Sequence, residues 1–371
     1  MESDSTEPEI YRKLQQHLDS FPIGFPVTKS GVEIKILQYL FTPEEAEIAL
    51  FLDYKPEPLH RIFKRVKKSK DITVEELQVI LDGLDKKGCL NAGKNPDTGE
   101  RFYANAFLVV GMYEYQVNRL TKEFSEYVEQ YFKEGFFNEF TKSGVLQLRT
   151  IPIEQSVEHE NFVATYDELR HIIETRKPIV VSSCICRQAK KLIGEGCNSP
   201  METCFQFGTA AYYYKDQGFG REVSKEEALD ILEQGQKAGL VIQPSNSQKP
   251  IALCMCCKCC CGVLTNLQKL PNPADIVATN HRSQVDAEKC IGCGTCVDIC
   301  PMNALELGMD DKSTVNLKRC IGCGVCVAAC PEQAIHLVKR DTEYVPPATN
   351  LDMYMKIMEG KAKALQKERE E

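Results

Sequence analysis

Residues 290–301 read CIGCGTCVDICP, and residues 320–331 read CIGCGVCVAACP. Each stretch has three cysteines separated by two residues, then a fourth cysteine that is followed directly by proline. The proline turns the chain after each fourth cysteine, because its ring cannot continue a regular backbone ladder. The repeat therefore predicts two equivalent four-thiol sites in the C-terminal part of the chain.

This spacing is typical of two [4Fe–4S] clusters, in which the fourth cysteine of each run binds the other cluster. Glycines within each run let the backbone pass close to the metal. Structural zinc sites built from Cys-x2-Cys pairs are the alternative, but zinc does not require a doubled run that ends in Cys-Pro. The predicted ligand sets are Cys290, Cys293, Cys296 and Cys330 for one cluster, and Cys320, Cys323, Cys326 and Cys300 for the other.

Residues 283–340 resemble the clostridial ferredoxins that carry two clusters, and all eight expected cysteines are present. The resemblance implies the ferredoxin fold of two short hairpins and two helices. It also implies that the two [4Fe–4S] clusters lie close enough for electrons to pass between them, so that this segment transfers electrons.

The chain has 371 residues and 19 cysteines, of which all but Cys89 lie between Cys184 and Cys330. So many thiols in a chain that begins without a secretory signal favour metal binding over disulfides. The apolar stretches are too short to span a bilayer, so we expect a cytoplasmic protein without membrane insertion. The net charge of −8 argues against broad nucleic-acid binding, which needs clustered lysine and arginine.

A second group of cysteines follows two apolar runs, each preceded by Lys-Pro-Ile, at residues 177–179 and 249–251. Both runs predict strands, which we expect to lie side by side and to deliver their thiols to one end of a sheet. Ten thiols suffice for one or two further [4Fe–4S] clusters, and a structural zinc or a thiol redox site is the alternative. Adjacent cysteines in an extended segment point to opposite sides, so one cluster can hardly bind all of 254–261. The ten candidates are Cys184, Cys186, Cys197, Cys204, Cys254, Cys256, Cys257, Cys259, Cys260 and Cys261, and Arg187 is a candidate hydrogen-bond donor to a cluster.

The whole pattern predicts an α+β protein of several domains. Helices that begin at Thr42 and Thr73, followed by a hairpin with its tip at 95–99, are the order of a winged helix-turn-helix domain. Further helices are expected to be capped by Thr165 and Ser224. The expected segments are a weakly ordered lead-in (1–32), a winged-helix-like domain (33–112), a helical connector (113–145), a Cys-rich α/β domain (146–281), the two-cluster ferredoxin domain (282–340) and a helical tail (341–371).

The charges of the winged-helix-like domain do not favour DNA reading. Its third helix, expected at 73–87, carries four acidic residues and only two basic ones, Lys86 and Lys87 at its C-terminal end. Base recognition uses basic and amide side chains instead. The basic cluster lies at 61–70 instead. We expect this domain to contact protein or to form a homo-oligomer, with nucleic acid an unlikely partner.

The whole chain also resembles a family of iron–sulfur proteins from anaerobic bacteria and archaea that join a winged-helix-like start to Cys-x-Cys-Arg, Cys-x-Cys-Cys and a C-terminal two-cluster ferredoxin. The resemblance lies in residues 184–187, Cys197 and residues 204–208, 220–228 and 254–260. The resemblance implies electron transfer and an anaerobic setting, and it names no substrate. The leading hypothesis is a multi-cluster electron-transfer protein or subunit that passes low-potential electrons to or from a partner oxidoreductase. A redox-responsive DNA-binding regulator and a catalytic iron–sulfur oxidoreductase that reacts at the central cysteines are the alternatives. No catalytic acid, base or nucleophile stands out.

Overall fold

The computed structural model describes residues 7–95, 97–156 and 167–370. The chain forms two compact units, Met1–Phe140 and Thr141–Glu371. In the described ranges, no helix is both long enough and apolar enough to cross a bilayer. The predicted helix cap at Thr165 lies outside the described residues.

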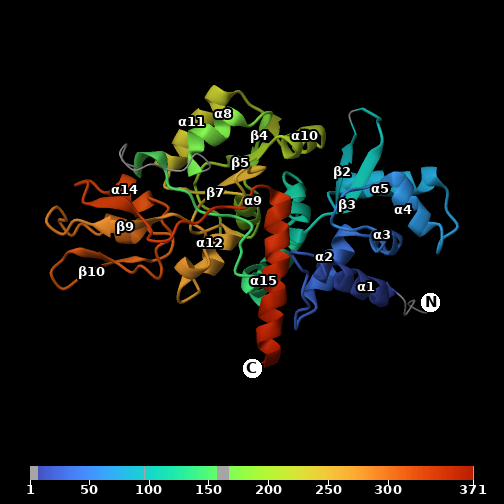
Figure 1. Ribbon diagram of the computed structural model, residues 1–371, viewed down its shortest axis with the longest axis horizontal. Coiled ribbons are helices and arrows are strands. Elements are labelled where there is room, and N and C mark those ends of the chain that lie inside the picture. The colour runs from blue at the N-terminus through green and yellow to red at the C-terminus, as the bar shows by residue number, and fades with distance from the viewer. Residues whose placement is uncertain (1–6, 96, 157–166, 371) are drawn as a thin grey trace. The chain divides into compact units, whose positions relative to one another are not determined.

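The first unit is mainly helical (Figure 1). Its described residues contain one small antiparallel sheet, with strand order β1-β3-β2. Capping boxes join Thr42 to Glu45 and Thr73 to Glu76, which confirms both predicted helix starts. Helices followed by a hairpin occur in the predicted order, and the winged-helix assignment itself stays a prediction. The elements are α1 (Glu7–Asp19), α2 (Val32–Leu40), α3 (Pro43–Ala49), β1 (Glu57–Pro58), α4 (Leu59–Val66), α5 (Val74–Lys87), β2 (Leu90–Lys94), β3 (Arg101–Asn105), α6 (Lys122–Tyr131) and α7 (Phe137–Lys142).

Two expectations for this unit are wrong. The lead-in contains a regular helix, α1, which buries Tyr11, Leu14 and Leu18. The prolines that follow this helix end it and do not prevent it from forming. The connector is not one helix from residue 113, because Asn118 has a positive φ of 66° that no right-handed helix can contain. The helix begins instead at α6, where the Thr121 side chain caps the backbone N–H of Phe124.

The central part of the second unit is a five-stranded sheet of order β6-β4-β5-β8-β7. Helices α8 and α11 pack together beside it (Figure 1), over a core that includes Phe205, Phe207 and Met255. Ser224 accepts the N–H of Glu227 and caps α11 as predicted. The elements are α8 (Leu169–Thr175), β4 (Ile179–Ser183), α9 (Ile185–Leu192), β5 (Glu202–Phe207), α10 (Thr209–Asp216), β6 (Arg221–Glu222), α11 (Lys225–Lys237), β7 (Val241–Pro244), β8 (Ala252–Cys256) and α12 (Gly262–Leu267).

The two strands expected to be neighbours, β4 and β8, are separated by β5, so that prediction is wrong. The intervening strand carries Cys204, which lies directly opposite Cys254 of β8. Because side chains alternate along a strand, Phe205, Leu253 and Met255 enter the hydrophobic core. The cysteines of β5 and β8 therefore lie on the opposite face of the sheet.

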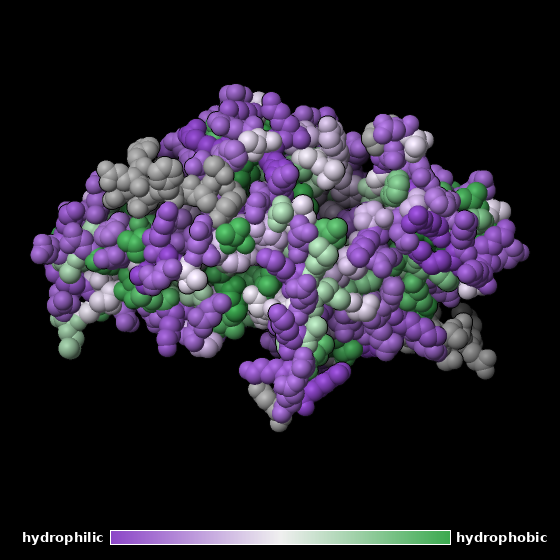
Figure 2. All heavy atoms as spheres, in the orientation of Figure 1, coloured by the Kyte–Doolittle hydropathy of each residue, from purple (hydrophilic) through white to green (hydrophobic). Residues whose placement is uncertain are grey.

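The remaining elements form the ferredoxin-like part and the tail. Strand β9 pairs antiparallel with β12, and β10 with β11, so only β10–β11 is a local hairpin and β9–β12 joins the two ends of the module. Helix α15 buries Met353 and Ile357, whereas its last turns are hydrophilic (Figure 2). The elements are β9 (His281–Val285), α13 (Thr295–Ile299), β10 (Leu305–Leu307), β11 (Ser313–Val315), α14 (Val325–Ala329), β12 (Ile335–Lys339) and α15 (Asn350–Glu370).

Candidate metal centres

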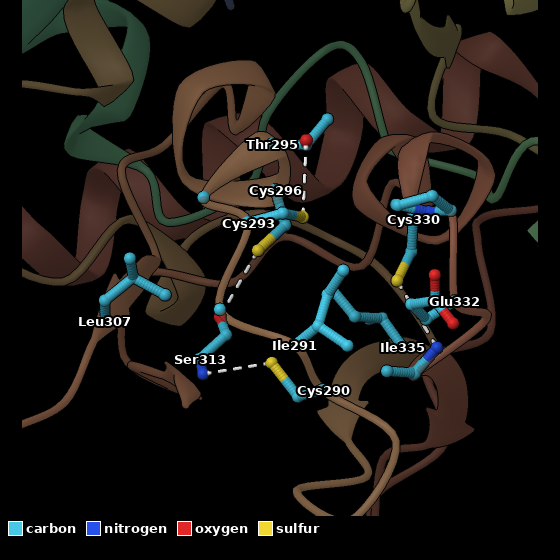
Figure 3. Close-up of a pocket in the computed structure, with 14 residues that line it drawn as sticks. Cys290, Ile291, Cys293, Thr295, Cys296, Leu307, Ser313, Cys330, Glu332 and Ile335 are labelled. Atoms are coloured by element: carbon cyan, nitrogen blue, oxygen red, sulfur yellow. Dashed lines mark hydrogen bonds between the residues drawn. The ribbon is translucent and has the colours of Figure 1, made fainter. Parts of the chain in front are cut away.

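Two pockets in the ferredoxin-like part are each lined by four cysteines. The first has about 350 Å³ of empty space and is lined by Cys290, Cys293, Cys296 and Cys330 (Figure 3). The second has about 290 Å³ and is lined by Cys320, Cys323, Cys326 and Cys300. These are the two sets that the sequence predicts, in which the fourth cysteine of each run lines the pocket of the other run. The structure therefore brings each predicted set together, and their role as cluster ligands stays a prediction.

A pair of serines supports the two pockets in the same way. The backbone N–H of Ser313 donates to Cys290 Sγ at 3.4 Å, and its hydroxyl lies 3.3 Å from Cys296 Sγ (Figure 3). In the other pocket, the N–H of Ser283 donates to Cys320 Sγ at 3.4 Å, and its hydroxyl lies 3.2 Å from Cys326 Sγ. These serines are not among the residues that the cysteine spacing predicts. Their signal was present, because both stand at the same distance before the first cysteine of a run.

Further backbone groups fit the pockets to an anionic metal–sulfur group. The N–H of Ala304 donates to Cys300 Sγ at 3.2 Å, and that of Ala334 donates to Cys330 Sγ at 3.3 Å. Gly322 has a φ of 67°, and a side chain there would collide with the carbonyl oxygen of His281. Hydrogen-bond donors directed at sulfur stabilise thiolates. Both pockets therefore favour the deprotonated form of their cysteines, which is the form that binds metal.

The two pockets differ in their exposure. In the first, Cys293 is exposed and the Ile291 side chain is 63% exposed. Hydrogen bonds from Thr295 lower the pKa of Cys293. In the second, Cys323 is buried and Ile321 is 2% exposed, and burial raises the pKa of the Cys323 thiol. The first pocket therefore has an exposed cysteine and an exposed apolar side chain at its rim, whereas the corresponding residues of the second are buried. We call them the open pocket and the enclosed pocket.

The ten central cysteines separate into two groups, of which the larger has six members and lies at the ends of β4, β5 and β8. Cys204 and Cys256 donate hydrogen bonds to Cys254, which lowers the pKa of Cys254. Hydrogen bonds from Cys186 and Cys256 lower the pKa of Cys261 to about 5. The six sulfurs thus form one connected set that readily takes negative charge, as metal ligands must. We call it the six-thiol group: Cys184, Cys186, Cys204, Cys254, Cys256 and Cys261.

The smaller group is tightly packed. The sulfur of Cys197 lies 3.8 Å from that of Cys257 and 3.5 Å from that of Cys260, and the sulfurs of Cys259 and Cys260 are 3.7 Å apart. All four sulfurs lie within 4.8 Å of one another. We call this set the four-thiol group. Cys259 is exposed, whereas Cys257 and Cys260 are buried.

Arg187 lies between the two groups and is completely buried. Its guanidinium donates to the carbonyl oxygens of Pro200 and Met255, each at 2.7 Å. Its Nε has no hydrogen-bond partner among the residues that the structure describes. Burial opposes its charge, but the sulfurs of Cys184, Cys257 and Cys256 hold the pKa of Arg187 above its usual value. A buried cation needs an anion beside it, and at this place the anions are sulfur.

Two contacts join the central thiols to the ferredoxin-like part. Lys258, inside the four-thiol group, donates from Nζ to the carbonyl oxygen of Asp298. Gln268, just after α12, donates to the carbonyl oxygen of Pro301. Both acceptors flank Cys300, a cysteine of the enclosed pocket. The short segment 298–301 therefore connects the central domain to that pocket.

The sequence comparisons agree with the geometry of this part of the chain. Residues 282–331 match the family model of the 4Fe-4S dicluster domain. Ferredoxin-2 of Desulfomicrobium norvegicum (strain DSM 1741 / NCIMB 8310) is 65% identical over 23 residues, which are 6% of this chain. The match covers 39% of that ferredoxin's length. No solved structure matches the chain. Residues 282–331 therefore form a ferredoxin domain of the 4Fe-4S dicluster type.

Proposed function

We propose that this protein is a multi-cluster electron carrier that passes low-potential electrons to or from a partner oxidoreductase. Two [4Fe–4S] clusters would be held by the eight cysteines of the ferredoxin domain, and a third by four sulfurs of the six-thiol group. When bound, such clusters supply one-electron redox chemistry. The observation that carries the proposal is the pair of four-cysteine pockets, one open to solvent and one enclosed.

The difference in exposure suggests where a partner would dock. Around the open pocket, Ile291 is 63% exposed, Leu307 41% and Cys293 is exposed as well. Exposed apolar side chains that gather in one place are typical of protein contacts. A partner would exchange electrons at this edge, while the enclosed pocket faces the central domain through the segment 298–301.

The six-thiol group suits a cluster for reasons of charge and number. Its sulfurs share their protons along a chain of hydrogen bonds, and Arg187 supplies a buried positive charge beside Cys184 and Cys256. Six thiols exceed the four ligands of one cubane. The two remaining thiols would then act as hydrogen-bond donors to the ligating sulfurs.

Counting iron and acid-labile sulfide per chain tests this proposal. Protein purified without oxygen should contain about twelve irons and as many sulfides, of which about eight belong to the ferredoxin domain. EPR spectroscopy of the chemically reduced protein should show interacting spins from the paired clusters. A count of about eight irons per chain would remove the third cluster from the proposal. The absence of acid-labile sulfide would overturn the entire proposal.

For the first unit we propose a protein contact or dimerisation rather than DNA binding. Helix α5 exposes Glu75 and Glu76 in its first turn, and Asp82 pairs with Arg101 at 2.5 Å. This face would repel phosphate. A gel-shift titration of oxidised and reduced protein at two salt concentrations separates the alternatives: salt-sensitive binding at submicromolar protein would favour a redox-responsive regulator.

A further inference from the structure

The spacing of the four-thiol group matches one metal ion rather than a cluster. Four thiolates at about 2.3 Å from a central zinc, arranged as a tetrahedron, lie about 3.8 Å from one another. The measured separations are 3.8 Å between Cys197 and Cys257, 3.5 Å between Cys197 and Cys260, and 3.7 Å between Cys259 and Cys260. A tetrahedral site therefore fits these sulfurs almost without rearrangement.

A cubane needs a wider arrangement, because each thiolate binds a different iron and the irons are held apart by bridging sulfides. The ferredoxin domain provides the internal reference. In the described part of the chain, only the four-thiol group brings three or more metal-binding side chains within 4.8 Å of one another. The eight ferredoxin cysteines, spaced for clusters, do not form such a set.

The local backbone explains how adjacent cysteines can bind one ion. Strand β8 ends at Cys256, and residues 258–260 form a turn before α12 begins at Gly262. In the turn, the sulfurs of Cys259 and Cys260 lie on the same side, which an extended chain would forbid. Cys197, from the loop between α9 and β5, supplies the fourth sulfur.

The charges around the group also fit. A zinc ion with four thiolates carries a net charge of −2, which is costly to bury without a cation. Arg187 is buried beside Cys257, and Lys258 lies within the same turn. The arrangement leaves no open ligand position, as is usual for structural zinc.

We propose that Cys197, Cys257, Cys259 and Cys260 bind one zinc ion, separate from every iron–sulfur cluster of the protein. The ion fixes the turn between β8 and α12 to the loop before β5. That turn sets the positions of Cys256 and Cys261, which belong to the six-thiol group on either side of it. The zinc site thus shapes the neighbouring centre without itself changing valence.

Metal analysis of the full chain, purified without oxygen and without added zinc, tests this proposal. We expect about one zinc per chain in addition to the iron. X-ray absorption at the zinc edge should show four sulfur neighbours at about 2.3 Å. Because zinc and iron are counted separately, a wrong cluster count would leave the zinc result intact, and the reverse also holds.

Variants assign the zinc to these residues. Cys259→Ser removes an exposed ligand with little risk to the core, and should weaken zinc binding by at least about tenfold, since even partners outside the ligand shell contribute 10- to 100-fold. Cys259→His should retain the zinc, because imidazole is also a zinc ligand. Cys254→Ser, in the six-thiol group, and Cys89→Ser, far from both groups in sequence, should keep one zinc per chain.

Several results would overturn the assignment. Zinc retained in Cys259→Ser and also in Cys257→Ser would place the ion elsewhere. Fewer than four sulfur neighbours would exclude a closed tetrathiolate site. A single iron with four sulfur neighbours at this place would mean that the site holds a redox-active ion and not zinc. Four additional irons with sulfide, lost in Cys259→Ser, would mean that it holds a cluster.

Discussion

The cysteines of the ferredoxin domain and those of the central domain are positioned by different means. In the ferredoxin domain, three cysteines of each pocket come from one short run of residues, and the fourth comes from the other run. In the central domain, the thiols come from two strands, two helix starts and two loops. The ferredoxin cysteines are brought together mainly by their spacing in the sequence. The central cysteines meet only after the sheet has formed.

The two regions also differ in what surrounds the sulfur atoms. Backbone N–H groups of Ser283, Ala304, Ser313 and Ala334 donate to ferredoxin cysteines. In the central domain, sulfur lies mainly against sulfur, with a buried arginine between the groups. Wide spacing with backbone donors suits polynuclear clusters, and close contact between four sulfurs suits a single ion. Sulfur separation therefore indicates the kind of centre where cysteine count alone does not.

The largest expected effect comes from removing a ligand in the enclosed pocket. Cys323→Ser should lose about four irons per chain, because Cys323 is only 7% exposed and no solvent ligand can take its place. Cys293→Ser removes the corresponding ligand of the open pocket, where water has access, and should retain more of its iron. Iron and sulfide counts on matched anaerobic preparations measure the difference.

Cys89→Ser provides the control for this pair, because the Cys89 thiol is buried and donates to the carbonyl oxygen of Leu40 at 3.4 Å, away from both pockets in sequence. It should keep the full iron content. Equal losses from Cys293→Ser and Cys323→Ser would show that exposure does not distinguish the two pockets.

Arg187 gives the next largest effect, this time in the central domain. Arg187→Met leaves buried thiolates without their cation and should destabilise the second unit by roughly 3–5 kcal/mol. Anaerobic denaturant unfolding measures this change, and metal analysis should show loss from the central sites before the ferredoxin domain.

Arg319→Met is the matched control, because the partners of Arg319 in the described part of the chain are all carbonyl oxygens, among them those of Met302 and Gln268. It should lower stability less and leave the central metals in place. Central metal content that is the same in both variants would mean that Arg187 acts through packing alone.

The sequence predicts the ferredoxin centres further than the central ones, because their cysteines lie close together in the sequence. The two ferredoxin sets could be named in advance, since the spacing of a repeated run restricts which sulfurs can meet. The central thiols could be named as ligands but not divided, because the division depends on β5 lying between β4 and β8. Spacing also carries no information on the turn at 258–260, which brings two adjacent cysteines to one side.

The fold itself was predictable where local chemistry decides it. Capping boxes at Thr42 and Thr73 mark helix starts that the structure contains. The break at Asn118 and the helix α1 depend on tertiary packing, which local patterns do not record. The exposed edge of the open pocket could not be anticipated either, because the two runs are nearly identical in sequence while Ile291 is exposed and Ile321 is buried.

Two glycines allow a finer test of the ferredoxin domain. Gly322→Ala would place a methyl group against the His281 carbonyl oxygen and 2.9 Å from Thr279 Oγ1. Gly294→Ala meets only Leu307 Cδ1, at 3.9 Å. Both have a positive φ and share a backbone cost of roughly 1–2 kcal/mol, but Gly322→Ala should lose about 1–3 kcal/mol more through the clash. Thermal unfolding and the rate of iron loss compare the two, and equal effects would contradict the close approach at Gly322.

The smallest expected effect concerns the two serines, which occupy equivalent places in the two pockets. Each hydroxyl lies within hydrogen-bonding distance of one sulfur, Ser283 to Cys326 and Ser313 to Cys296. A donor to sulfur stabilises the more negative, reduced state, so alanine should lower the reduction potential. A hydrogen bond contributes about 0.5–1.5 kcal/mol, which for one electron is roughly 20–60 mV at 59 mV per tenfold change.

Redox titration followed by EPR spectroscopy measures both potentials in one sample. Ser283→Ala should shift the cluster of the enclosed pocket by more than Ser313→Ala shifts the open one, because water can replace a lost donor only where the pocket is exposed. A shift of the same size in both variants would mean that solvent reaches both pockets equally. A rise in potential would show that the hydroxyls do not donate hydrogen bonds to the ligating sulfurs, and would remove the serines from the set of groups that tune the clusters.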